Sequence, residues 1–193
     1  MNVSILKYNA GNIQSVRIAL ERLGLKPIVT DDPDIISRSD KVIFPGVGEA
    51  SSAMDYLKTR NLDQLLVKLK IPVLGICLGL QLMSRYSEEN DTECLNIFDT
   101  CVRHFPLKDK VPHMGWNTIN HLEGAIFKGI PENSYVYFVH SYYAEITPGV
   151  IAETNYILDF VSALQSDNFF AVQFHPEKSG FIGEKILKNF LDL

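Results

Sequence analysis

The sequence predicts an α/β fold: a three-layer sandwich in which helices cover both faces of a central, mostly parallel sheet that carries antiparallel additions. Three observations support this prediction. In the first half of the chain, short apolar segments typical of strands alternate with segments of helical periodicity. Residues 71–76, IPVLGI, are apolar throughout, as expected for a strand buried on both faces of a parallel sheet. The second half holds several strand-like segments with few helices between them.

The first half can be followed element by element. Strands are predicted at residues 3–8, 26–30, 40–48 and 71–76, and Pro45-Gly46 interrupts the third. The first helix is predicted from helical spacing that ends before Gly24, at Ile13, Val16, Leu20 and Leu23. A longer helical stretch carries Met54, Leu57, Leu62, Leu65, Leu66 and Leu69. Residues 78–87, LGLQLMSRYS, are predicted to form the next helix.

The second half is dominated by strands. The segments concerned are residues 135–146, 150–154, 160–165 and 169–174. Because few helices separate them, we expect antiparallel additions to the sheet. The chain closes with an amphipathic helix whose apolar face consists of Ile182, Ile186, Leu187 and Phe190. No internal repeat or linker is visible, so residues 1–193 are predicted to form a single domain.

Composition excludes several classes of function. The net charge is −5 and no basic cluster is present, which argues against non-specific nucleic-acid binding. The three cysteines, Cys77, Cys94 and Cys101, have no metal-ligand spacing and indicate a reducing compartment without disulfides. The longest apolar run, residues 71–83, is shorter than the roughly 20 residues of a membrane span, and the N-terminal residues do not resemble a signal peptide. We therefore expect a soluble, cytoplasmic protein that contacts no membrane.

The segment Gly75-Ile76-Cys77-Leu78-Gly79 has the G-x-S-x-G form of a nucleophile elbow, with cysteine in place of serine. A tight strand-to-helix turn requires residues without bulk on either side of the nucleophile, which explains the two glycines. The N-terminus of the following helix favours a thiolate, and the N–H group of Leu78 can face a developing oxyanion. The alternative is that Cys77 is a small buried packing residue, as free cysteines often are.

A cysteine nucleophile needs a base and a group that orients the base. His175 ends the strand-like segment 169–174 and is followed by Pro176 and Glu177. In an extended segment, residues two apart point to the same side, and the proline keeps the residue before it extended. Glu177 is thus predicted to hold the imidazole of His175 and to leave its other nitrogen for Cys77. The alternative is a strand-end histidine beside a surface glutamate.

The loop after the third predicted strand, FPGVGEA, is the candidate source of a second oxyanion donor. Its glycines, Gly46 and Gly48, flank Val47, allow the backbone to approach a substrate and allow a peptide unit to reorient. The alternative is an ordinary strand-to-helix turn, in which Pro-Gly is common.

These motifs together resemble the class I, triad-type glutamine amidotransferases, which have a flavodoxin-like fold. More narrowly, the chain resembles the glutaminase subunits of imidazole glycerol phosphate synthase, which act in histidine biosynthesis. The matching stretches run in family order across nearly the whole chain: NAGNIQSV, DKVIFPGVG, PVLGICLGLQLMSRYSEE, VPHMGWNTI, YFVHSYY and AVQFHPEKSG. The PGVG loop and the PHMGWN stretch favour this narrower group over other class I members.

The resemblance implies roles for the motif residues and no cofactor or metal. Cys77 attacks the side-chain amide of glutamine and forms a γ-glutamyl thioester, His175 transfers protons, and Glu177 orients His175. The N–H groups of Leu78 and of the loop formed by Gly46, Val47 and Gly48 stabilise the oxyanion. The loop is expected to become productive only when the partner's site is occupied. The α-amino and carboxylate end of glutamine is assigned to Gln81, Glu89, Ser141 and Tyr142.

The resemblance also implies a partner, a (β/α)8-barrel cyclase subunit that receives the ammonia in a heterodimer. There the ammonia enters the formation of imidazole glycerol phosphate and an aminoimidazole carboxamide ribotide. The positions matched to the partner interface are Met114, Trp116, Asn117, Tyr137 and Lys178. For Trp116, the alternative is a core position, which is common for a lone tryptophan.

Other interpretations remain at this stage. A related glutaminase could supply a barrel enzyme of surface-sugar biosynthesis through identical glutamine chemistry. A stress-response cysteine hydrolase of similar fold and a non-catalytic binding module are alternatives of other classes. Residues 94–110 lack the glycines that many relatives carry there, and Cys94 and Cys101 are interpreted as structural. His104, His121 and His140 receive no catalytic role, and His140 is expected to pack or to form hydrogen bonds.

Overall fold

The computed structural model describes residues 1–8 and 11–193, so Asn9 and Ala10 of the NAGNIQSV stretch lie outside the described residues. Its main sheet consists of β1 (Val3–Leu6), β2 (Ile28–Thr30), β3 (Lys41–Phe44), β4 (Val73–Ile76), β11 (Val150–Asn155), β12 (Asp159–Ser166) and β13 (Phe169–Val172). The strand order is β11-β12-β13-β4-β3-β1-β2. The strands from β13 to β2 pair in parallel, whereas β12 and β11 are antiparallel additions at one edge. The predicted fold class is confirmed.

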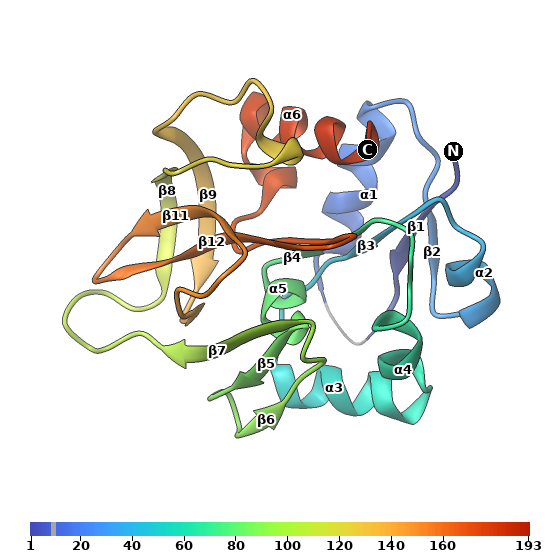
Figure 1. Ribbon diagram of the computed structural model, residues 1–193, viewed down its shortest axis with the longest axis horizontal. Coiled ribbons are helices and arrows are strands. Elements are labelled where there is room, and N and C mark those ends of the chain that lie inside the picture. Colours follow the sequence, from blue (N-terminus) through green and yellow to red (C-terminus); the bar gives the residue numbers. More distant parts are fainter. Residues whose placement is uncertain (9–10) are drawn as a thin grey trace.

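Helices cover both faces of this sheet (Figure 1). On one face lie α1 (Ile13–Arg22) and α6 (Gly180–Leu191), and on the other lie α3 (Ala50–Thr59), α4 (Leu62–Leu66) and α5 (Leu78–Met83). Short α2 (Pro33–Ser37) lies beside the β2 edge. Each helical layer packs its apolar stripe onto the sheet and forms one of two hydrophobic cores.

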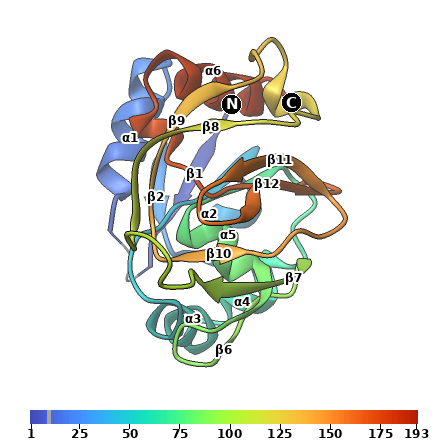
Figure 2. The same ribbon diagram turned by 90° about the vertical axis from the view of Figure 1, so that its left-hand side faces the viewer.

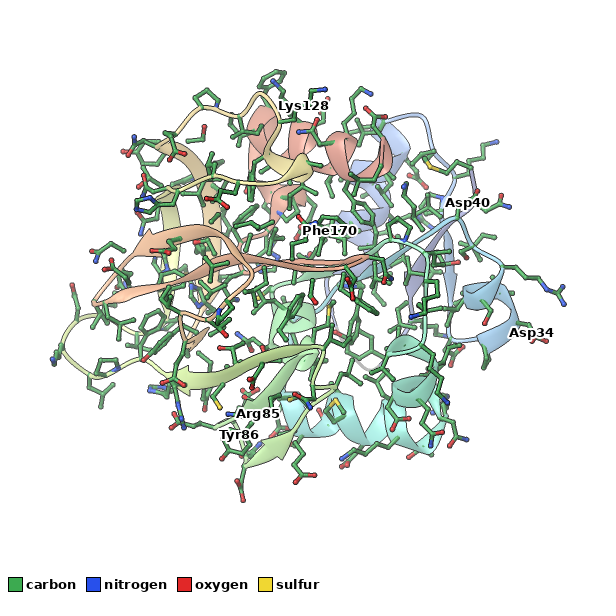
Figure 3. All side chains as sticks on the ribbon, in the orientation of Figure 1. Asp34, Asp40, Arg85, Tyr86, Lys128 and Phe170 are labelled. Carbon is green, nitrogen blue, oxygen red and sulfur yellow. The ribbon has the colours of Figure 1, made fainter. Side chains whose placement is uncertain are left out.

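Figure 3 illustrates this division between interior and surface: Phe170, on β13, lies in the interior, whereas the labelled charged side chains Asp34, Asp40, Arg85 and Lys128 lie at the periphery. Phe170 packs its ring against that of Phe190 on α6, with the centroids 6.0 Å apart. This aromatic contact joins β13 to α6 on the same side of the sheet as α1.

Two smaller β structures complete the molecule. A four-stranded sheet, in the order β10-β7-β5-β6, consists of β5 (Ser84–Ser87), β6 (Thr92–Glu93), β7 (Phe98–His104) and β10 (Tyr142–Ala144). A hairpin consists of β8 (His113–Ile119) and β9 (Ser134–His140), paired antiparallel. Figure 2 looks onto the side that carries this hairpin, with α6 above it and β7 and β10 below. Two short 3₁₀ turns contact α6: η1 (Ala125–Phe127) and η2 (Pro176–Lys178).

Four sequence predictions need correction. The segment 169–174, expected among the antiparallel additions, forms β13, which pairs in parallel with β4 and antiparallel only with β12. The helix predicted for residues 78–87 ends at Met83, because Ser84 is extended and starts β5, which pairs with β7. The stretch from Met54 to Leu69 is two helices, separated by Asn61 in the left-handed conformation. The strand predicted at residues 135–146 is two strands that join different sheets, β9 and β10. In the part of the chain described, no helix combines the length and hydropathy needed to cross a membrane.

Candidate active site

Cys77 occupies a strained turn between β4 and α5. Its backbone has φ 53° and ψ −104°, a conformation that costs a non-glycine residue energy and that proteins retain mainly at functional sites. A Cβ atom on Gly79 would lie 2.0 Å from the Phe44 carbonyl oxygen, and one on Gly75 would lie 2.6 Å from the Met83 sulfur. Both glycines are therefore required by close packing, as the nucleophile-elbow interpretation expects.

The parallel pairing of β13 with β4 brings the rest of the site to Cys77. Val172 lies opposite Ile76, and its carbonyl accepts a 2.8 Å hydrogen bond from the Cys77 N–H group. The chain after β13 thus continues beside the elbow. The side-chain amide of Gln173, which is fully buried, donates to Cys77 Sγ at 3.5 Å. His175 follows two residues later and is close enough to the Cys77 sulfur for its charge to act on the pKa of the imidazole.

His175 and Glu177 form a buried pair. Nδ1 of His175 donates to Oε1 of Glu177 at 2.7 Å, and neither side chain is exposed. His175 is extended as predicted, with φ −100° and ψ 95°, but Glu177 lies in the 3₁₀ turn η2 rather than in an extended segment. The turn still directs the carboxylate to Nδ1. The amide of Asn12 also donates to Glu177 Oε1.

Charge around His175 favours its protonated form. Burial by itself lowers the pKa of His175, but negative charge on the Cys77 sulfur and the hydrogen-bonded Glu177 carboxylate outweigh burial and raise it to about 10. Within the described residues, Nε2 of His175 is buried and has no hydrogen-bond partner. This nitrogen is therefore available for proton exchange with the thiol and with a bound substrate.

The loop after β3 accepts the hydrogen bond of the Leu78 N–H group, which sequence analysis expected to bind the oxyanion. The N–H group of Leu78 donates to the carbonyl of Gly46 at 3.3 Å, so it does not face the cavity as a free donor. Two contacts hold the loop in this form: the Tyr8 hydroxyl donates to the Pro45 carbonyl at 2.5 Å, and the Gly11 N–H group donates to the Val47 carbonyl at 3.0 Å. A reorientation of the Gly46 peptide is required to free Leu78.

A cavity of about 280 Å³ opens beside Cys77. Its lining includes most of the residues that sequence analysis assigned to the oxyanion loop and to substrate binding: Val47, Gly48, Leu78, Gln81, Glu89, Ser141 and Tyr142. Gln81, buried on α5, donates to the carbonyl of Tyr142 at 3.1 Å. The volume suits a single amino acid or a ligand of similar size.

The comparisons with known proteins agree with this arrangement. A family model described as glutamine amidotransferase class-I matches residues 5–193. Proteins named imidazole glycerol phosphate synthase subunit HisH match over their full length and the full length of this chain, with 56% identity in Bacteroides thetaiotaomicron and 48% in Blochmanniella floridana. The chain belongs to the class-I glutamine amidotransferase family. Within this family, the chain is similar over its full length to proteins of the narrower HisH group.

Solved structures support the fold alone. A crystal structure titled glutamine amidotransferase has a TM-score of 0.79 at 17% identity and covers 100% of this chain and 98% of its own. A glutamine amidotransferase from Thermotoga maritima has a TM-score of 0.67 at 15% identity, with 100% of this chain and 83% of its own covered. The arrangement of layers is thus common to amidotransferases that differ widely in sequence.

In this amidotransferase, Glu89 joins the cavity to the start of α3. Its carboxylate accepts from the N–H group of Ala50 at 2.7 Å. Burial and the nearby charge of Glu49 raise the pKa of Glu89, while the Ala50 N–H group opposes the rise. Of the other residues predicted to bind substrate, Ser141 and Tyr142 come from the junction between β9 and β10.

The β8–β9 hairpin presents an apolar outer face. Met114 and Trp116 are 59% and 56% exposed, which makes the core alternative for Trp116 wrong. Tyr137 lies opposite Trp116, and the Lys178 ammonium group is 5.9 Å from the centre of the Tyr137 ring. Asn117 alternates to the inner face of β8, where its amide donates to the carbonyl of Asn155 at 3.0 Å.

Three residues beside the triad had no role in the sequence analysis: Asn12, Gln173 and Ser179. Ser179 Oγ donates to the His175 carbonyl at 2.6 Å and accepts from the Tyr137 N–H group at 2.9 Å, so it joins η2 to the hairpin. The alternation that selected His175 and Glu177 also points to Gln173, whereas nothing in the sequence pattern selects Ser179. The described residues contain no group of three or more His, Cys, Asp or Glu side chains suited to a metal ion.

The raised pKa of His175 makes a prediction about pH and stability. An unfolded histidine has a pKa of about 6.5. Because the folded pKa is higher, protonation of His175 stabilises the fold fully below about pH 6.5, and this contribution is lost as pH rises through about 10. Replacing Glu177 by Gln lowers the pKa of His175 and should cost about 2 kcal/mol of unfolding free energy near pH 6.

Urea unfolding of the wild type and Glu177→Gln at several pH values between 6 and 10 measures this effect. The stability difference should be largest at pH 6 and shrink toward pH 10. Glu184→Gln, on the exposed side of α6, is the matched control and should show no such trend. A difference that stays constant or grows with pH would contradict the assignment.

Proposed function

We propose that the chain is the glutaminase subunit of an imidazole glycerol phosphate synthase. It hydrolyses L-glutamine to glutamate and ammonia, and the ammonia passes to a cyclase barrel subunit that forms imidazole glycerol phosphate and an aminoimidazole carboxamide ribotide in histidine biosynthesis. The observation that carries the proposal is the buried His175–Glu177 pair beside Cys77, which lines the cavity, in a chain 56% identical to a HisH protein. Residues 1–193 act as one domain, and the three free cysteines suit a cytoplasmic setting.

The geometry supports a thioester mechanism. Cys77 Sγ attacks the side-chain carbonyl carbon of glutamine, and His175 Nε2 gives a proton to the amide nitrogen as the C–N bond breaks and ammonia leaves. His175 then removes a proton from water, which attacks the γ-glutamyl thioester and releases glutamate and the thiol. Glu177 holds the imidazole orientation through both steps by accepting from Nδ1.

The loop contacts support control of this chemistry by the partner. With the Gly46 carbonyl bonded to the Leu78 N–H group, oxyanion stabilisation is incomplete, and removal of one such donor slows related enzymes by about 100-fold or more. We therefore expect the isolated chain to hydrolyse glutamine slowly. Rotation of the Gly46–Val47–Gly48 segment frees Leu78 and supplies a loop N–H group as a second donor.

The exposed face of the β8–β9 hairpin supports the partner assignment. Met114, Trp116, Tyr137 and Lys178 form one continuous surface of apolar, aromatic and cationic groups, a composition enriched at the centres of protein interfaces. The same hairpin bonds to η2 through Ser179, so the surface lies close behind the triad. Ammonia released at Cys77 therefore has a short path to a partner docked here.

The Cys77→Ala variant in complex with the cyclase subunit tests the chemistry. Glutamine-dependent synthesis should fall by about 10⁴-fold or more, because the nucleophile is gone. Synthesis from added ammonium salts should continue at the wild-type rate, because the partner's site is untouched. Cys94→Ala, which changes a cysteine outside the cavity, is the control and should keep both activities. Glutamine consumption at the normal rate by Cys77→Ala would show the mechanism to be wrong.

The Trp116→Ala variant tests the docking surface. Truncation of a central interface tryptophan should weaken binding of the cyclase subunit by about 2 kcal/mol, or roughly 30-fold, as measured by calorimetry. Val67→Ala is the control, because Val67 is also exposed but follows α4 on the opposite face of the sheet. Equal affinity of the wild type and Trp116→Ala would exclude this face as the centre of the interface.

A further inference from the structure

Two buried histidines outside the triad lie at one end of the β8–β9 hairpin, next to the cavity beside Cys77. His113 starts β8 and His140 ends β9, and the two residues lie directly opposite each other in the hairpin register. Nδ1 of His113 is 3.0 Å from Nε2 of His140. His140 also lines the cavity beside Cys77. Neither histidine has a role in the proposed chemical steps.

The hydrogen bond between His140 and Tyr142 fixes which ring nitrogens of the two histidines carry protons. Nδ1 of His140 lies 2.7 Å from the carbonyl of Tyr142, which can only accept, so the proton of a neutral His140 is on Nδ1. Nε2 of His140 is then an acceptor, and His113 must donate to it from Nδ1. Consequently, Nε2 of His113 is also an acceptor and requires a donor of its own.

Asn117 supplies that donor. Its Nδ2 lies 3.3 Å from Nε2 of His113. The orientation of this amide is set independently, because Nδ2 also donates to the Asn155 carbonyl and Oδ1 accepts from the Thr118 N–H group at 2.8 Å. The two ends of the chain therefore agree: every hydrogen bond points from Asn117 toward Tyr142.

The surroundings keep both rings neutral and fixed in orientation. The His113 ring is stacked on Phe138 and on Tyr156, at centroid distances of 4.8 Å and 4.1 Å. Burial lowers the pKa of His113 to about 4 and that of His140 to about 3. At neutral pH, neither ring carries a charge that could reverse the direction of the chain.

The chain continues into the catalytic side of the cavity. The Tyr142 carbonyl that accepts from His140 also accepts from Gln81 Nε2. The same Gln81 nitrogen lies 3.2 Å from Gln173 Oε1, and Gln173 in turn donates to Cys77 Sγ. The position of the Tyr142 carbonyl therefore influences how Gln81 is presented to a ligand in the cavity.

We propose that His113 and His140, both as Nδ1–H tautomers, are positioning residues that hold the Tyr142 carbonyl and thereby orient Gln81 for glutamine binding. The substrate in this statement rests on the proposed function, whereas the tautomers do not. The chain also ties the pocket to Asn117, the neighbour of Trp116 on β8.

The tautomers are tested first, on the wild-type protein by ¹⁵N NMR of the histidine rings. Both His113 and His140 should show a protonated Nδ1 and an unprotonated Nε2. In Asn117→Asp, a carboxylate oxygen replaces the amide donor, so Nε2 of His113 should gain a proton. An Nε2–H tautomer of either histidine in the wild type, or an unchanged His113 in Asn117→Asp, would overturn the hydrogen-bond chain.

Glutamine kinetics in the complex with the cyclase subunit test the positioning role. His140→Phe keeps the aromatic volume but loses the donor to Tyr142, and should raise KM for glutamine about tenfold with kcat changed less than about twofold. His140→Asn keeps a donor near the Nδ1 position and should restore much of the lost affinity. His121→Asn, at an exposed position in the left-handed conformation that Asn tolerates, is the control.

The outcomes distinguish a failure of the positioning role from a failure of the proposed function. If His140→Phe is folded by circular dichroism and has the wild-type KM, the positioning role is wrong even when the NMR result is as expected. If the wild-type complex does not hydrolyse glutamine at all, the proposed function fails, and the NMR result still decides whether the chain of hydrogen bonds exists.

Discussion

The parallel pairing of β13 with β4 is the interaction on which the site depends. It places Cys77, the proposed nucleophile that follows Ile76, beside the residue after Val172, from which the chain leads to His175 and Glu177. The strained backbone of Cys77 is held by the hydrogen bond to the Val172 carbonyl and by the close packing of Gly79 under Phe44. The neighbouring strands β13, β4 and β3 therefore determine the geometry of the triad, and the surrounding layers keep their sheet rigid.

The hairpin formed by β8 and β9 gives this rigid centre a connection to the surface. On its outer face it carries Trp116 and Tyr137, and the backbone of Tyr137 bonds to His175 and Ser179. The loop after β3 differs, since the Gly46 carbonyl accepts the hydrogen bond of the Leu78 N–H group, the proposed oxyanion donor. The arrangement combines a preformed His175–Glu177 pair with an oxyanion donor that is not free. Under the proposed function, this suits hydrolysis that waits for a partner to receive ammonia.

Much of this was predictable from the sequence because the signals are local. A continuous apolar run bounded by glycines identifies β4 and the elbow. The short spacing of His175 and Glu177 predicts their pairing, although the 3₁₀ turn η2, and not an extended segment, brings the two side chains together. The helix predicted at residues 78–87 was wrong in its second half, since pairing with β7 overrides the helical pattern of Ser84–Ser87. The orientation of the Gly46 peptide depends on its contact with Leu78, and the hydrogen bond of Asn117 depends on Asn155. Both partners are distant in sequence and are not visible in a local pattern.

The most direct measurement is rapid acid quenching of the complex during turnover of glutamine, followed by mass spectrometry of the peptides. The account predicts a γ-glutamyl group attached to the Cys77 sulfur, and its amount should fall when His175 is replaced by Asn, because attack on the amide needs the imidazole. Glutamate formation without any adduct on Cys77, or an adduct on a different residue, would contradict it.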